Sequence, residues 1–284
     1  MIKRWPSRLL RRLRRGRLVS VLGSSLSDNQ RYPQACLDAA LSYERFNAFR
    51  RNPDYQQILE QLGPDWGEAY WQAIRAMPAL AAGMERFRAN DQVGGPILYN
   101  FEGIGPFSPT TLRYVKVLGD LQRLFGPLAG LHIHEIGVGY GGQCRVIQAS
   151  ERPASYTLID LQPALALCQR YLEQFCLTAP VRFRSMNELE ESSSDLVISN
   201  YAFSELRRDV QDLYLTRVIR QARRGYMTLN RINPDDFDSY SYEELLATIP
   251  GSRLEPEIPL THPGNAVLIW GFNPGAASAA HRDG

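Results

Sequence analysis

A glycine-rich turn at residues 137–142 is the stretch of this sequence best suited to bind a ligand. The chain reads HIHEIGVGYGGQ over residues 132–143, which is an expected strand followed by four glycines and the start of an expected helix. Glycine permits a positive φ and lets a ligand approach the backbone where a Cβ atom would otherwise stand. In an open α/β sheet such a turn lies at the carboxyl ends of the strands, where ligands bind. The turn therefore predicts a ligand site.

Two cofactor classes fit this turn. Gly137, Gly139 and Gly142 form the pattern G-x-G-x-x-G, and Asp160 lies 18 residues beyond the last of them, as in a nicotinamide dinucleotide site. Glu135 stands two residues before the first glycine, however, and E-x-G-x-G-x-G resembles the S-adenosylmethionine loop of class I methyltransferases. That resemblance implies that Glu135 approaches the methionine moiety and that Asp160 holds the ribose hydroxyls. It is favoured because the motif follows about 130 residues of chain and because an antiparallel closing strand is expected near residues 267–272.

Further segments extend the resemblance over roughly residues 90–272. They are Asp91 with Gly94-Gly95-Pro96, SPTTLRY at 108–114, LIDL at 158–161 and SNYAFSEL at 199–206. With the glycine turn they resemble the sugar O-methyltransferases of bacterial glycan and glycosylated natural-product gene clusters. One departure is Gly95, where a more polar residue is expected. The resemblance implies an S-adenosylmethionine-dependent O-methyltransferase that methylates a sugar hydroxyl in a glycan or glycoconjugate.

Transfer of a methyl group to a sugar hydroxyl needs an aligned hydroxyl and a group that removes its proton. Glu205 is the first candidate for this base, because it follows an expected strand at residues 195–199 and its loop belongs to the carboxyl edge. Its alternative role is a carboxylate stabilised at a helix N-terminus. His262, in the segment THPGN at 261–265, is the second candidate, since its ordinary pKa suits a base.

The other expected site residues fall into two groups. The cofactor is expected to contact Glu135, Gly137, Gly139, Tyr140, Gly141, Gly142, Asp160, Leu161, Asn187 and Asn200. The acceptor is expected to contact Arg113, Tyr114 and Tyr201, and Arg113 suits a carboxylate, a phosphate or a sugar ring. No His, Asp and Glu cluster has convincing metal-ligand spacing, so no metal is expected. The rival functions are an O-methyltransferase for a phenol or carboxylate and an inactive methyltransferase fold that serves as a binding subunit.

From residue 131 the chain alternates between strands and helices. Strands are expected at 131–136, 155–159, 181–184, 195–199, 225–229, 253–257 and 266–272. Such alternation predicts an α/β fold with a Rossmann-like, doubly wound, mostly parallel sheet, closed by an antiparallel strand. Residues 128–272 are therefore expected to form the S-adenosylmethionine-binding domain.

The first part of the chain is expected to be helical. Apolar spacing predicts one helix from Tyr32 to Arg50, a second that starts at Asn52-Pro53 and a third over residues 66–77. Ser108-Pro109 predicts the N-cap and first residue of a fourth helix. Residues 28–127 are thus expected to form a helical unit that covers the acceptor site together with the glycine-rich loop 91–107.

The net charge of +2 is unevenly distributed. Residues 1–17 hold eight basic side chains and no acid, which leaves 24 basic and 30 acidic residues, or −6, for the rest. An acidic body argues against nucleic-acid binding. Three interpretations of the basic appendix, residues 1–27, stay open. It is expected to be a peripheral membrane helix that brings the enzyme to a lipid-linked glycan, or else to be a solvated tail, or else to be a transit peptide. Four cysteines without a CxxC pair suggest a cytoplasmic protein, and residues 273–284 suggest a disordered tail.

Overall fold

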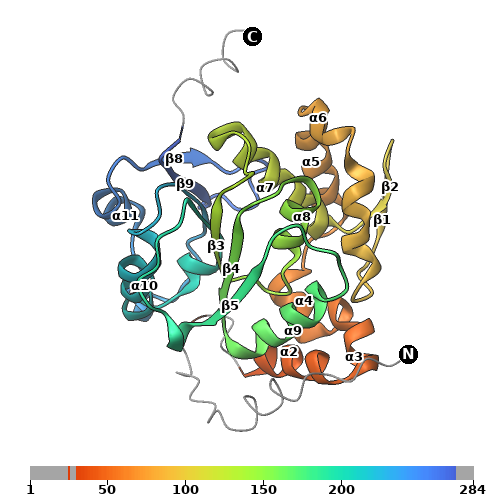
Figure 1. Ribbon diagram of the computed structural model, residues 1–284, viewed down its shortest axis with the longest axis horizontal. Coiled ribbons are helices and arrows are strands. Elements are labelled where there is room, and N and C mark those ends of the chain that lie inside the picture. The colour runs from red at the N-terminus through yellow and green to blue at the C-terminus, as the bar shows by residue number, and fades with distance from the viewer. Residues whose placement is uncertain (1–24, 26–29, 273–284) are drawn as a thin grey trace.

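A seven-stranded sheet forms the centre of the protein. The computed structural model describes residue 25 and residues 30–272. The strands are β3 (His132–Ile136), β4 (Ser155–Asp160), β5 (Val181–Ser185), β6 (Leu196–Asn200), β7 (Gly225–Leu229), β8 (Arg253–Pro256) and β9 (Ala266–Trp270). Their order is β5-β4-β3-β6-β7-β9-β8, and only β9 runs antiparallel to its neighbours. All seven predicted strands are present, and the predicted mostly parallel sheet with an antiparallel closing strand is confirmed (Figure 1).

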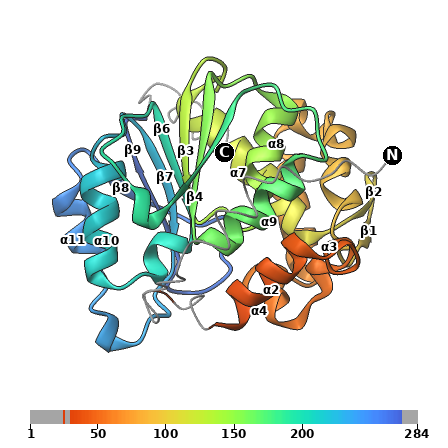
Figure 2. The same cartoon turned by 60° about the horizontal axis from the view of Figure 1, so that its bottom comes forward.

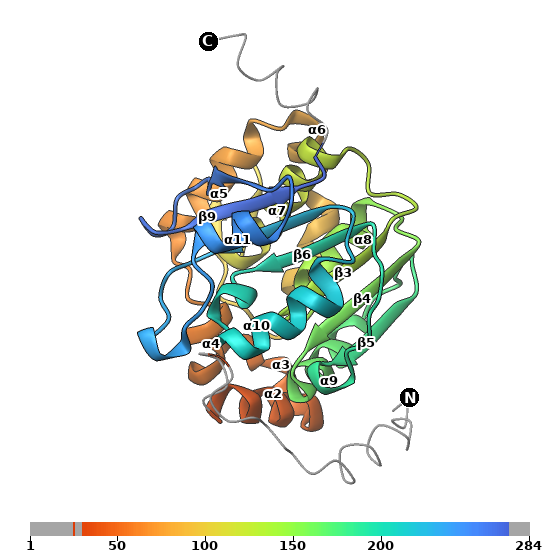
Figure 3. The same ribbon diagram turned by 90° about the vertical axis from the view of Figure 1, so that its left-hand side faces the viewer.

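Helices cover both faces of this sheet. One face carries α7 (Pro109–Phe125), α8 (Gly142–Ser150) and α9 (Gln162–Leu172), and the other carries α10 (Arg208–Tyr214), a π-helical turn (Leu215–Ile219) and α11 (Tyr242–Thr248). In β6, Leu196 and Ile198 belong to the first core and Val197 belongs to the second, as the two-residue period of a strand requires. Figure 3 shows α10 and α11 lying over their face of the sheet. A sheet buried on both faces leaves its strand ends as the place for ligands.

The N-terminal helices pack beside α9. They are α2 (Arg31–Leu41), α3 (Tyr43–Asn47), α4 (Pro53–Leu59), α5 (Pro64–Arg75) and α6 (Pro78–Ala81), with 3-10 turns at Phe49–Arg51 and Met84–Gln92. Figure 2 shows α2 against α9. The single helix predicted over residues 32–50 is wrong, because Ser42 is extended and its side chain caps α3 by accepting a hydrogen bond from the Arg45 backbone. The predicted caps Asn52 and Ser108 are confirmed.

Residues 91–107 do not form the unstructured covering loop that was expected. They include a small hairpin of β1 (Tyr99–Phe101) and β2 (Gly105–Phe107). None of them lines the cavity of about 320 Å³ at the carboxyl edge of the sheet. Gly95 has a φ of +61°, and a Cβ atom there would stand 2.7 Å from the Asn47 carbonyl oxygen. A side chain of any kind would therefore be strained at this position.

The basic appendix, apart from Ser25, and the tail at 273–284 lie outside the described residues. The expectations of a membrane-surface helix and of a disordered tail therefore stay predictions. Among the described helices, none combines the length and apolar character that a membrane crossing requires.

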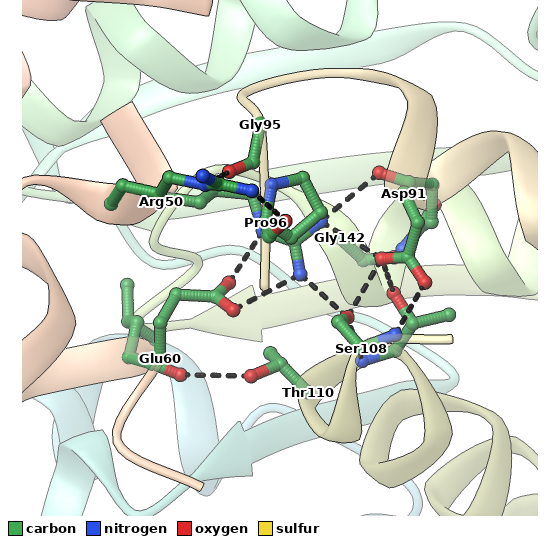
Figure 4. A network of polar contacts seen from close by, with 12 residues as sticks. Arg50, Glu60, Asp91, Gly95, Pro96, Ser108, Thr110 and Gly142 are labelled. Atoms are coloured by element: carbon green, nitrogen blue, oxygen red, sulfur yellow. Dashed lines mark hydrogen bonds and ion pairs between the residues drawn. The ribbon is translucent and has the colours of Figure 1, made fainter. Parts of the chain in front are cut away.

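A buried ion-pair network ties the N-terminal helices to α7. The Arg50 guanidinium is fully buried and donates to both Glu60 carboxylate oxygens, at 2.6 and 3.1 Å, and to Asp91 at 3.0 Å (Figure 4). Asp91 also accepts hydrogen bonds from the hydroxyls of Ser108 and Thr111, both at 2.7 Å. Four segments that are distant in sequence are therefore fixed to one another by charged hydrogen bonds, which are about twice as strong as neutral ones.

Replacing Arg50 with Met is expected to lower the free energy of unfolding by about 3–5 kcal/mol, because two buried carboxylates lose their cation. Urea unfolding at neutral pH measures this loss. The control is Arg45→Met, which removes an exposed ion pair to Asp38 and should change stability by no more than about 1 kcal/mol. Equal stabilities for the two variants would contradict the structural role given to Arg50.

Candidate active site

A cavity of about 320 Å³ opens at the carboxyl edge of the sheet. The first residue after each of five adjacent parallel strands lines it: Gly137, Leu161, Met186, Tyr201 and Asn230. Helices α2, α4 and α5, with the segment between the last two, close the other side with Tyr32, Ile58, Leu59, Leu62 and Trp66. This placement is where the fold predicts a ligand.

The glycine turn approaches neighbouring segments too closely for larger side chains. Gly137 has a φ of +74°, and a Cβ atom on it would stand 1.9 Å from the Ala202 Cβ. Gly139 has a φ of +52°, and its Cβ would stand 2.6 Å from a Leu59 methyl group. Both glycines line the cavity, so the backbone of the turn forms part of its wall.

Asp160 lies at the β4 end of the cavity. Its carboxylate accepts hydrogen bonds from the backbone N–H groups of Gly139, at 3.0 Å, and Leu161, at 2.6 Å. Burial raises the pKa of Asp160 to about 6, although these backbone hydrogen bonds act in the opposite direction. The hydrogen bond from Gly139 joins the glycine turn to the end of β4. The Asp160 side chain remains part of the cavity lining.

Glu135 lies beneath the turn and does not line the cavity. Its side chain is 2% exposed and accepts a 2.7 Å hydrogen bond from the Tyr156 hydroxyl. Burial raises the pKa of Glu135 to about 8, against the lowering effect of that hydrogen bond. The carboxyl group is therefore mostly protonated at neutral pH. The expectation that Glu135 approaches the methionine moiety of the cofactor stays a prediction.

Several other predicted contacts also lie outside the cavity: Tyr140, Gly141, Gly142, Asn187 and Tyr114. The Tyr140 ring packs in the core under the Arg50 guanidinium, 4.9 Å from its ring centroid. Gly142 is enclosed by Tyr114 and Tyr140, whose ring atoms would stand 2.4 and 2.7 Å from a Cβ atom. Glycine is needed here for packing inside the protein, since neither tyrosine reaches the cavity.

Two candidate bases share the cavity. Glu205 is partly buried and accepts a 2.8 Å hydrogen bond from the Asn230 side chain. Burial raises the pKa of Glu205, while the Asn230 hydrogen bond and the Arg113 charge act to lower it. His262 lines the same cavity from the loop before β9. The structure thus brings together two residues that are 57 positions apart.

Tyr201 is held in an unusual backbone conformation beside them. Its φ is +67°, which is uncommon for a residue other than glycine. The Tyr201 hydroxyl donates to Glu257, and the Arg113 guanidinium lies 5.8 Å from its ring centroid. Arg113, Tyr201 and Asn200 all line the cavity, and their assignment to the acceptor or the cofactor stays a prediction.

The sequence predicted that the N-terminal helices cover the acceptor, but it did not mark which of their residues line the cavity, and it missed Asn230 beside Glu205. Leu59 and Trp66 carry only an ordinary apolar helix pattern, so nothing in the sequence marked them. Asn230, by contrast, directly follows β7, and the rule that parallel strand ends meet at one edge was sufficient to find it. Within the described part of the chain, no three His, Cys, Asp or Glu side chains are grouped as metal ligands.

The strand order decides the fold type. A sheet ordered β5-β4-β3-β6-β7-β9-β8, with β9 alone reversed and a glycine turn after the central strand β3, is the arrangement of class I methyltransferases. The chain has the class I methyltransferase fold. In this fold the ligand cavity lies where the structure has it, over the ends of β3, β4 and β6.

Comparisons with known proteins add little beyond this. No protein-family model and no curated protein sequence matches the chain. Among solved structures, a "putative RNA methyltransferase" from Pyrococcus horikoshii is similar at 16% identity over 66% of this chain and 95% of the other, with a TM-score of 0.41. The pyocyanin biosynthetic protein PhzM is 14% identical over 57% of this chain and 56% of its own, with a TM-score of 0.41. PigF, solved with SAH, is 14% identical over 49% of this chain and 55% of its own, with a TM-score of 0.37. This chain thus spans about half the length of the last two, and the fold assignment rests on the strand order.

Replacing Gly137 with Ala is expected to destabilise the protein by about 2–4 kcal/mol, from the positive φ and from the contact with Ala202. Urea unfolding measures it. Gly103→Ala is the matched control, because Gly103 has a φ of +83° and no neighbour within 4 Å, so it shows the backbone cost alone. Adding Ala202→Gly to Gly137→Ala should recover the excess over this control. If Gly137→Ala and Gly103→Ala cost the same, the close approach is not important.

Replacing Glu135 with Gln is expected to leave the stability at pH 5 near that of the wild type and to make the protein relatively more stable as the pH rises. The folded-state pKa of about 8 lies above the ordinary value of 4.5. The contribution of Glu135 to stability is therefore complete below pH 4.5 and is lost as the pH rises through 8. The unfolding free energies of the two proteins should diverge by at most about 1.4 kcal/mol per pH unit in this window. Parallel curves would show that Glu135 is ionised in the folded protein.

Proposed function

We propose that this protein is an S-adenosylmethionine-dependent O-methyltransferase that acts on a sugar hydroxyl. The observation that carries the proposal is a cavity lined by two partly buried carboxylates, Asp160 on the β4 side and Glu205 on the β6 side. One carboxylate suits the ribose of a nucleoside cofactor. The other suits the removal of a proton from an acceptor.

The residues on the β3 and β4 side fit S-adenosylmethionine. Asp160 can accept hydrogen bonds from two ribose hydroxyls, and the glycine turn allows the cofactor to approach the backbone at Gly137 and Gly139. The Asn200 side-chain oxygen is buried without a hydrogen-bond partner among the described residues, and it can accept a hydrogen bond from an ammonium group. When bound, the cofactor supplies a methyl group that is already activated by the positive sulfur. This chain's residues then have to bind, orient and deprotonate the acceptor.

Glu205 is the proposed base for the acceptor hydroxyl. Burial of its carboxylate raises its pKa, which makes it a stronger base than an exposed carboxylate. Asn230 holds one of its oxygens and leaves the other to accept the proton. His262 is the second candidate and is proposed to hold the acceptor hydroxyl if Glu205 is the base.

A sugar acceptor is supported by the polar character of this side of the cavity. Hydrogen-bonding side chains of Gln61, Asn230, Thr261, His262 and Asn265 line it together with the Trp66 ring. Amide and hydroxyl groups match a ring that carries many hydroxyls, and an aromatic face can stack on it. The resemblance of the segments at 108–114 and 199–206 to sugar O-methyltransferases points in the same direction.

Replacing Glu205 with Gln is expected to lower the rate of methyl transfer by about 10²–10⁴-fold, the usual contribution of general base catalysis. The affinity for S-adenosylmethionine should stay within about twofold of the wild type, since Glu205 lies away from Asp160. The assay uses methyl-labelled cofactor with a panel of nucleotide sugars and lipid-linked glycans, and the wild-type rate should rise with pH through the raised pKa of Glu205.

The control for this test is Glu190→Gln, which changes an exposed carboxylate and should leave the rate unchanged. His262→Gln tests the second candidate and should cost less than Glu205→Gln. A rate of methyl transfer in Glu205→Gln that stays close to the wild-type rate would exclude Glu205 as the base. Methylation of phenols or carboxylates, with none of the sugars accepted, would show that the proposed acceptor class is wrong.

A further inference from the structure

Arg113 is a buried cation that has no carboxylate partner in the part of the chain that the structure describes. The side chains of three Arg and Lys residues are buried among the described residues: Arg50, Arg113 and Lys116. Arg50 is paired with Glu60 and Asp91, and Lys116 is paired with Asp120 at 2.6 Å, one turn further along α7. Within the described part of the chain, the Arg113 guanidinium forms no ion pair or hydrogen bond, and its Nε is buried without a partner. It lies only over the rings of Tyr114 and Tyr201.

The carboxylates around Arg113 are already used by other groups. Glu60 is held by Arg50. Glu257 accepts hydrogen bonds from the Tyr201 hydroxyl, from the backbone and hydroxyl of Thr261, and from the Asn265 side chain. Glu205 is bonded to Asn230 and lies beyond ion-pair distance of Arg113. Among the described residues, no carboxylate is therefore paired with this cation.

An isolated charge of this kind is costly to bury, because nothing replaces the water that it loses. Arg113 is 7% exposed and lines the cavity, so its free N–H groups are available to a ligand there. A guanidinium offers a planar pair of donors that matches a carboxylate or a phosphate. The site is thus complementary to an anionic group.

The position of Arg113 assigns that group to the acceptor. In the sheet order, β4 with Asp160 lies on one side of β3, and β6 and β7 lie on the other. The ring of Tyr201, which follows β6, is the cavity-lining ring that Arg113 contacts. The positive charge of Arg113 also acts on Glu205, the proposed base. Arg113 therefore lies on the side opposite the ribose site.

We infer that the acceptor is an anionic sugar, whose carboxylate or phosphate is bound by Arg113 while a hydroxyl of the same molecule faces Glu205. This inference rests on the proposed function for the identity of the sugar, but the binding of an anion at Arg113 does not require turnover. A uronic acid and a sugar phosphate share the chemistry that Arg113 recognises. The two sources are separated by the test.

Calorimetric titration of the full chain provides that test. The probes are methyl β-D-glucuronide, glucose 1-phosphate, the neutral methyl β-D-glucoside and inorganic phosphate, each with and without S-adenosylhomocysteine. The wild type should bind one of the two anionic sugars at least about tenfold more tightly than the neutral sugar, and the stronger of the two identifies the source. Arg113→Gln should abolish this preference, and Arg113→Lys should keep part of it, because the ammonium retains the charge but not the planar pair of donors.

The matched control is Arg123→Gln on the same helix, where the arginine is partly exposed and paired with Glu255. It should keep the full preference. The inference is overturned if the wild type binds none of the sugars or does not prefer an anionic one. It is also overturned if Arg113→Gln keeps the preference. If Arg113→Gln weakens only the binding of S-adenosylhomocysteine, Arg113 is assigned to the cofactor carboxylate and the inference is likewise overturned. Should Arg113→Gln not fold, Arg113→Lys decides alone, and an undiminished preference in it is the contrary result. Absence of S-adenosylhomocysteine binding counts against the proposed function and leaves the anion preference to be judged separately.

Discussion

The buried guanidinium of Arg50 is the interaction on which the candidate site depends. Its ion pairs to Glu60 and Asp91 and its 2.8 Å hydrogen bond to the Ser108 hydroxyl fix the end of α4, the 3-10 turn at Met84–Gln92 and the N-cap of α7 to one another. Its guanidinium also lies over the ring of Tyr140 in the glycine turn. One charge thus positions the helical cover, the helix that carries Arg113 and the turn itself. Without it, nothing else among the contacts described above joins all three.

The sheet could be predicted from sequence because each strand is a short β-rich run bounded by turn residues, and because the glycine turn marks the central strand. The direction of side chains could not be predicted to the same extent. Glu135 has the expected type and spacing, yet it faces the core and Tyr156, since alternate residues of a strand point to opposite faces. The break at Ser42 was missed because the apolar spacing continues across it. The partners of Arg50 lie up to 58 positions away in sequence, and only the fold brings them together.

The charges within the cavity divide it into two halves. Asp160 is held by backbone N–H groups on the β4 side, while Glu205 and the unpaired Arg113 lie toward β6. In a low-dielectric site the electrostatic interactions of each of these charged groups are stronger than in water. The separation of the two carboxylates allows one to bind a cofactor while the other acts on an acceptor. A cation next to the proposed base suits an acceptor that carries its own negative charge. The placement of Arg113 and Glu205 on the same side of the cavity thus fits both the proposed reaction and the proposed anionic substrate.

The most direct test of cofactor binding is the titration of the wild-type chain with S-adenosylhomocysteine by calorimetry, with NAD as the comparison. The predicted result is saturable binding of about one S-adenosylhomocysteine per chain and no heat with NAD. The variant Asp160→Asn should weaken this binding by about tenfold or more, because a charged acceptor of the ribose hydroxyls is lost. No heat with S-adenosylhomocysteine, or binding of NAD instead, would contradict the assignment of this cavity to a methyl donor.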